Sequence, residues 1–167
     1  MPNIIEKILK KLLIAKGFKQ KKNCWYIDLV ETIALIDLQK SKWGNQYYIN
    51  LAINLKSILG TNLYPKENES HIRTRLTSLL SENEKLNLEK SLNLEDELYS
   101  EIQRKQLITS TIITIVMPIF ENLSSIKLIK EFLIKPESKK YLIDRKVKEI
   151  AFNKTKIPST LKEFEIR

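Results

Sequence analysis

Residues 33–54, IALIDLQKSKWGNQYYINLAIN, constrain the fold more than any other stretch of this 167-residue chain. Two runs of alternating apolar residues flank a short polar connection at residues 41–45, and this arrangement is typical of a β-hairpin. Because successive side chains of a strand point to opposite faces, we expect one face of the second run to be core. That face carries Tyr47, Ile49, Leu51 and Ile53, and the other carries Tyr48, Asn50, Ala52 and Asn54.

The first run divides in the same way, with its polar residues gathered next to the turn. One face holds Ile33, Leu35, Asp37 and Gln39, and the other holds Ala34, Ile36, Leu38 and Lys40. Asparagine is a poor strand former, so the amides on these strands predict a polar patch beside the aromatic residues Trp43, Tyr47 and Tyr48. Amides that only bond to neighbouring loops would give the same pattern.

Size and composition favour a single domain over residues 1–167, large enough to bury a core without disulfides or metals. The one cysteine excludes an intramolecular disulfide, and one cysteine with one histidine does not provide a tetrahedral zinc site without added carboxylates. The three glycines are isolated, which disfavours nucleotide-binding loops. We therefore predict no cofactor, no metal and no catalytic residue, in a reducing, cytoplasmic setting.

The charges divide the chain into two basic ends and an acidic middle. Residues 1–56 hold ten lysines and four acids, residues 57–103 five cations and nine acids, and residues 104–167 fourteen cations and seven acids. A basic excess can mark a nucleic-acid partner, but a lysine-rich solvated surface explains the same composition. No membrane partner is predicted, because the longest low-charge segment, Leu107 to Phe120, is shorter than the roughly 20 residues of a span.

Along the chain, a helix is predicted over residues 3–16, with Asn3 and Glu6 as its capping box and Gly17 as its stop. A sheet follows at about residues 23–76. Its first strand is expected at Cys24 to Asp28, and its third ends at residues 58–60. Residues 71–80 fit a strand and a helix equally well, because their apolar residues match both periods.

A helical part is predicted at about residues 93–152, starting at Asn93. Its long apolar face would be ended or kinked by Pro118 near Met117. Ser125 and Ser138 are expected to cap two further helices, the second burying Leu142 and Ile150. Residues 153–167 are expected to form a tail with weak periodicity.

Few residues offer chemistry. Asp37 and Lys40 lie on opposite faces of their strand, so they do not form the acid and lysine pair of a restriction-type nuclease. Read as a strand, residues 71–75 place His71, Arg73 and Arg75 on one face, where they could act on a phosphate without a metal. A single binding surface is predicted from polar residues that interrupt strand patterns, namely Gln39, Ser41, Trp43, Asn50, His71, Arg73 and Arg75.

Several blocks of sequence together resemble a bacterial family, domain of unknown function 4304. They are Gly17-Phe18-Lys19, Leu38 to Gly44, Tyr48 to Leu51, His71 to Leu76, and Met117 to Glu121. The resemblance covers about residues 1–135, and departs from the family at Leu29-Val30 and in the lysine-rich C-terminus. It implies a fourth strand at His71 to Leu76, and an immunity role like that of small α+β proteins encoded near secreted toxins.

These observations predict an α+β fold, in which an N-terminal helix packs on an antiparallel three- or four-stranded meander and a C-terminal helical half covers the same face. The leading functional hypothesis is a non-catalytic protein-binding module, specifically an immunity protein that blocks a toxin domain. The alternative is a nucleic-acid-binding protein or a metal-independent nuclease that uses His71, Arg73 and Arg75. The sequence leaves the oligomeric state open.

Overall fold

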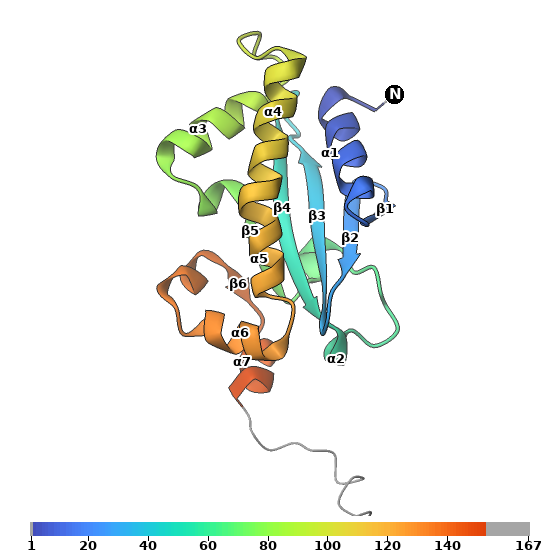
Figure 1. Ribbon diagram of the computed structural model, residues 1–167, viewed down its shortest axis with the longest axis vertical. Helices are drawn as coiled ribbons and strands as arrows, with labels where there is room; N and C mark the ends of the chain where they lie inside the picture. The colour runs from blue at the N-terminus through green and yellow to red at the C-terminus, as the bar shows by residue number, and fades with distance from the viewer. Residues whose placement is uncertain (1, 153–167) are drawn as a thin grey trace, which may run out of the picture.

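The computed structural model describes residues 2–152, and its centre is a six-stranded antiparallel sheet whose strand order follows the chain (Figure 1). The strands are β1 (Lys19–Lys21), β2 (Cys24–Asp28), β3 (Thr32–Lys40), β4 (Tyr47–Leu55), β5 (Ile72–Arg75) and β6 (Leu142–Ile143). The α+β class and the antiparallel meander are confirmed, with six strands in place of three or four. The predicted tail at 153–167 lies outside the described residues.

The two additional strands lie at the edges of the sheet. All three residues of β1 are exposed, and β6 has only two residues, so neither shows the alternating burial that reveals a strand in sequence. Residues 71–76 resolve as β5 followed by a 3₁₀ turn, which confirms the predicted fourth strand. The chain leaves β4 at Leu55, earlier than residues 58–60, because a short helix begins at Lys56.

Helices and turns occupy much of the remaining chain. They are α1 (Ile4–Ala15), α2 (Lys56–Leu59), η1 (Glu67–Glu69), η2 (Leu76–Leu79), α3 (Glu82–Ser91), α4 (Glu101–Thr111), η3 (Ile112–Val116), α5 (Met117–Asn122), α6 (Ile126–Leu133), η4 (Pro136–Lys140) and α7 (Arg145–Phe152). The capping box of α1 forms as predicted, since Asn3 accepts from the Glu6 amide and Glu6 accepts from the Asn3 amide.

Two predicted helix starts are wrong. The long helix begins at Glu101, because Ser100 and Gln103 form its capping box, whereas Asn93 lies in the loop before it. Ser138 lies inside the 3₁₀ turn η4 and does not cap a helix. Leu142 is exposed on the short strand β6, and Ile150 is half-buried on α7. Ser125 caps α6 as predicted, accepting from the Leu128 amide.

Pro118 does not end the long helix. The chain passes from α4 through a π-helical turn at η3 into α5, and Pro118 stands in the first turn of α5. A proline inside an α-helix removes one amide donor and crowds the carbonyl four residues earlier. The wider π turn immediately before Pro118 accommodates both effects, so the predicted kink takes the form of a change in helix type.

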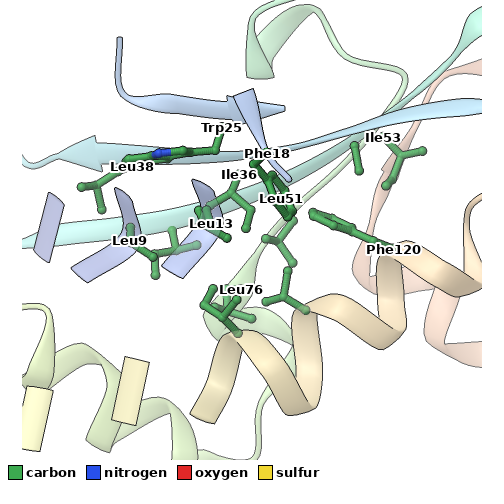
Figure 2. Close-up of a cluster of buried hydrophobic side chains, with 14 of the residues drawn as sticks. Leu9, Leu13, Phe18, Trp25, Ile36, Leu38, Leu51, Ile53, Leu76 and Phe120 are labelled. Carbon is green, nitrogen blue, oxygen red and sulfur yellow. The ribbon is translucent and has the colours of Figure 1, made fainter. Parts of the chain in front are cut away.

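The main core lies between the sheet and one helical layer. Helices α1, α4 and α5 cover the same sheet face, as predicted, and Figure 2 shows Leu9 and Leu13 of α1 and Phe120 of α5 close to the strand residues. The indole of Trp25 is fully buried there, and its N–H has no hydrogen-bond partner among the described residues. A smaller cluster around Leu35 lies on the opposite face.

Within residues 2–152, no single helix has both the length and the apolar character needed to cross a membrane. One sharply bent pair, Glu101–Asn122 with Ile126–Leu133 at 104°, meets those two criteria only when its members are taken together.

Candidate functional site

The sheet face opposite the main helical layer carries a row of polar and charged side chains. Strand register places Lys21, Cys24, Asp37, Asn50 and Arg75 directly opposite one another on β1 to β5. Residues paired across neighbouring strands project to the same side, so the row crosses five strands. The polar residues of the hairpin therefore continue into a larger polar surface.

Asn50 joins the members of this row. Its Nδ2 donates to Asp37 Oδ2 at 3.1 Å and to Gln39 Oε1 at 3.0 Å, while its Oδ1 accepts from Arg75 Nε at 3.4 Å. Arg75 Nη2 also donates to Gln39 Oε1 at 3.3 Å, and the guanidinium lies 4.3 Å from the centre of the Tyr48 ring. Arg75 is thus held by two amide oxygens and an aromatic ring, which are all uncharged.

Cys24 extends the network across β2. Its Sγ donates to Asp37 Oδ1 at 3.2 Å. Burial, and then the bond to Asp37 and its negative charge, raise the pKa of the Cys24 thiol to about 12. The thiol is therefore protonated at neutral pH, so Cys24 is a hydrogen-bond donor and not a nucleophile.

His71 belongs to a structural corner at the end of β4. Its Nδ1 accepts from the Leu55 amide at 3.0 Å, so in the neutral ring the proton is on Nε2 and neither nitrogen has a free lone pair. Burial lowers the pKa of His71, which favours that neutral form. Next to it, the fully buried Asn54 donates to Ser70 Oγ at 3.0 Å and accepts from the His71 amide at 3.3 Å.

A hollow of about 350 Å³ lies beside this network, and we call it the β5 hollow. It is lined by Gln39, Asn50, Glu67, Arg73, Thr74, Arg75, Ser78, Lys139, Lys140, Tyr141 and Leu142. Burial raises the pKa of Glu67, and the charges of Arg73 and Arg75 oppose that shift. The sequence did not indicate Glu67, Lys139 or Lys140, because they reach β5 only through the η1 turn and the β6 pairing.

The tip of the β3–β4 hairpin forms a second surface, which we call the hairpin end. Trp43 is 95 % exposed there. The hydrogen bonds that hold this turn include those from the Trp43 amide to Ser41 Oγ at 3.1 Å, from the Asn45 amide to Glu95 Oε1 at 3.2 Å, and from the Leu94 amide to Asn45 O at 3.0 Å. The exposed residues around the adjoining loop and the start of α4 include Glu95, Glu97, Leu98, Glu101 and Ile102.

Arg104 holds the loop that supports the hairpin end. This side chain is 5 % exposed and donates to the carbonyl oxygens of Lys90, Ser91, Asn93 and Asp96. The carbonyls at the end of α3 are therefore paired by a cation, which also suits the negative end of that helix. No sequence pattern singled out Arg104, because its partners are backbone atoms.

The predicted surface therefore divides in two. Gln39, Asn50, Arg73 and Arg75 line the β5 hollow, and His71 lines a neighbouring hollow that shares Arg73. Ser41 and Trp43 lie at the hairpin end. Tyr47, which the sequence placed beside the patch, is buried in the core on the other face.

The described residues contain no group of three or more His, Cys, Asp or Glu side chains placed to hold a metal ion. The side chains at these surfaces are the cations and amides of the strands, the carboxylates beside them and the exposed tryptophan.

Comparison with known proteins gives a family and no closer relative. No curated protein matches the chain, and no solved structure matches it. The family model described as Domain of unknown function (DUF4304) matches residues 9–122, which is more than half of the chain. These residues include the part of α1 from Leu9 onward and every strand except β6. The resemblance noted in the sequence is thus confirmed, and the chain belongs to the DUF4304 family.

Proposed function

We propose that this protein is a non-catalytic protein-binding module that contacts its partner through the hairpin end. The observation that carries the proposal is the 95 % exposure of Trp43 on a turn that is fixed to the loop before α4. An exposed tryptophan contributes little to the folded state, whereas tryptophan is enriched among the residues that dominate binding energy. A fixed turn also reduces the entropy lost when a partner binds.

The charges at the hairpin end favour a basic partner. Four acids, Glu95, Asp96, Glu97 and Glu101, lie in or next to the loop that bonds to the turn, while the hairpin itself carries the two exposed cations Lys40 and Lys42. Complementary charge accelerates encounter and rejects wrong partners. A toxin that acts on nucleic acid needs a basic active site, so an immunity protein that covers such a toxin domain fits this surface.

A binding role also agrees with the state of the two residues best suited to catalysis. The Cys24 thiol is protonated and donates a hydrogen bond to Asp37. In neutral His71, Nδ1 accepts from the Leu55 amide and Nε2 carries the proton. A general base needs a free lone pair near the operating pH.

Co-expression with candidate toxins from neighbouring genes tests the proposal. We expect Trp43→Ala to abolish neutralisation and to weaken measured affinity at least tenfold, with Glu97→Lys weakening it further at low salt. The matched control is Val30→Ala, which changes an apolar residue 76 % exposed at the β2–β3 turn and should bind normally. Equal binding by Trp43→Ala and Val30→Ala would contradict the proposal.

Nucleic-acid binding is the second candidate, and the cations of the β5 hollow favour it. Each phosphate that a cation neutralises releases counterions, so affinity for DNA or RNA must fall steeply as salt rises. Titration of labelled oligonucleotides at two salt concentrations tests this candidate. Absence of binding at the lower concentration would eliminate it.

A further inference from the structure

Four basic residues and one acidic residue are among the described residues that line the β5 hollow. Arg73 and Arg75 come from β5, Lys139 and Lys140 come from η4, and the acid is Glu67 of η1. Their charges repel one another, so their convergence raises the energy of the empty hollow. An anion from outside the chain would relieve that repulsion.

Within the described residues, the cations of the hollow make no ion pair, although the Glu67 carboxylate lines the hollow with them. The ion pairs of the described residues are Lys56–Asp28 and Arg145–Glu149, and neither lies in the hollow. The bonding partners of Arg75 are uncharged, as described above. The guanidinium of Arg73 makes no hydrogen bond or ion pair with another side chain or carbonyl that the structure describes, so its donors are free for a ligand.

The fold positions these groups without a ligand. Arg73 and Arg75 alternate with Thr74 along β5, so both project to the hollow side, while Thr74 Oγ1 donates to the Lys140 carbonyl at 2.9 Å. Arg73 also pairs with Leu142 across β5 and β6. The backbone that carries the two lysines of η4 is thereby fixed beside the strand that carries the arginines.

We propose that the β5 hollow binds a phosphate-type dianion, either free phosphate or the phosphate group of a small monoester. Guanidinium groups match phosphate oxygens in pairs, and lysines add point charges. A volume of about 350 Å³ lies at the small end of the range of ligand sites. A single carboxylate would bring one charge to four cations, so it is the weaker fit. This site is separate from the hairpin end.

Glu67 sets the affinity of this site. It is the one acid among the described residues that line the hollow, and the charges of Arg73 and Arg75 act on it. Its carboxylate competes with the ligand for the same cations and repels a dianion. Replacement by glutamine keeps the shape of the side chain and removes the charge, so affinity should increase.

Titration of the full chain with inorganic phosphate, followed by amide NMR shifts, tests the proposal. We expect saturable binding. Arg73→Gln should weaken it at least tenfold, which corresponds to about 1.4 kcal/mol, and Glu67→Gln should strengthen it about fivefold. The matched control is Lys127→Gln, which removes one exposed charge from α6, outside the hollow, and should leave affinity unchanged. Shifts should centre on β5 and η4.

Absence of saturable binding with a Kd below about 10 mM would overturn the proposal, and so would equal losses in Arg73→Gln and Lys127→Gln. Glucose 6-phosphate binding more tightly than phosphate would assign the site to monoesters, and equal binding would assign it to the free ion. If an oligonucleotide binds with a salt slope of several phosphates while phosphate alone does not, the hollow is part of a nucleic-acid surface and the proposal fails. Trp43→Ala should not alter phosphate affinity, so the two proposals fail independently.

Discussion

At the scale of single residues, hydrogen bonding decides the role of each titratable group. Arg104 and Arg75 carry the same side chain but have different roles. Arg104 is buried and donates hydrogen bonds to four backbone carbonyls, which fixes a loop. Arg75 is exposed, bonds to amides and keeps its charge available to ligands. An arginine that pairs with carbonyls is structural, whereas one on an open face can recognise an anion.

Cys24 is expected to be unreactive while the protein is folded. Its pKa is raised to about 12 by burial and by Asp37, so the thiolate fraction at neutral pH is very small. Alkylation by iodoacetamide should be about 100-fold slower than for the unfolded chain. Mass spectrometry of time points, with and without urea, measures both rates. Comparable rates in the two conditions would contradict the bond to Asp37.

His71 should make stability depend on pH in a definite direction. Burial lowers the pKa of His71 below its ordinary value of 6.5, so between the two values the unfolded chain binds a proton that the folded chain does not. The free energy of unfolding contributed by His71 is therefore constant above pH 6.5 and falls as pH drops below it. Urea midpoints at about pH 7.5 and about pH 5.5 measure the effect.

His71→Gln is the matched variant for that measurement. The Gln side chain has an oxygen that can accept from the Leu55 amide, and it does not titrate in this range. We expect the loss of stability between the two pH values to be smaller in the variant than in the natural chain. An unchanged loss would assign the pH dependence to other groups.

At the scale of elements, caps fix where the helices begin. Ser81, Ser100 and Ser125 accept from amides of the first turns of α3, α4 and α6. Each cap satisfies an amide that lacks a partner within its helix. The sequence rules identified Asn3 and Ser125 but placed the start of the long helix at Asn93, seven residues before its cap at Ser100. Acidic residues follow both positions, and only the capping box with Gln103 distinguishes the true start.

Ser100→Ala should cost about 1 kcal/mol of unfolding free energy, because the cap of α4 is lost. The matched control is Ser110→Ala, which lies exposed inside the same helix and should change stability by less than about 0.5 kcal/mol. Urea denaturation of the two variants and the natural chain measures both values. Equal costs would show that the helix does not depend on this cap.

Strands were predictable where most of their residues are buried and were not where they are exposed. The faces assigned to β3 and β4 are those observed, because one face packs against helices. The edge strands β1 and β6 escaped prediction because pairing with a neighbour, rather than burial, defines them. The β5 hollow was only half predicted for the same reason, since Lys139 and Lys140 reach it through β6.

At the scale of the whole molecule, one core joins the sheet to the helix that precedes it in the chain and to the helices that follow its first five strands. Buried residues from Ile5 of α1 to Val147 of α7 belong to a single cluster. The turn after β2 is also bonded to the turn between α5 and α6, where Thr32 Oγ1 donates to Leu123 O at 2.9 Å and the Glu31 amide donates to Ser124 O at 2.8 Å. Sheet and helices should therefore unfold together.

That expectation can be tested with two probes. In a Trp43→Phe background, Trp25 of β2 is the remaining tryptophan and reports on the sheet, while far-ultraviolet circular dichroism reports on the helices. We expect coincident urea transitions, and Thr32→Val should lower both midpoints together. The free energy of unfolding should fall by about 1–2 kcal/mol, because the Leu123 carbonyl loses its partner. Separate transitions would mean that the helical half unfolds on its own.

The order of strands and helices along the chain also bears on folding during synthesis. The first five strands leave the ribosome before the residues of α4, α5 and α6 that cover them. Until then α1 is the main helix on that apolar face, and the nascent sheet exposes the rest of it to chaperones and to other chains. A chain that ends between Arg75 and Glu101 would contain the sheet without the helices α4, α5 and α6, and that fragment should aggregate.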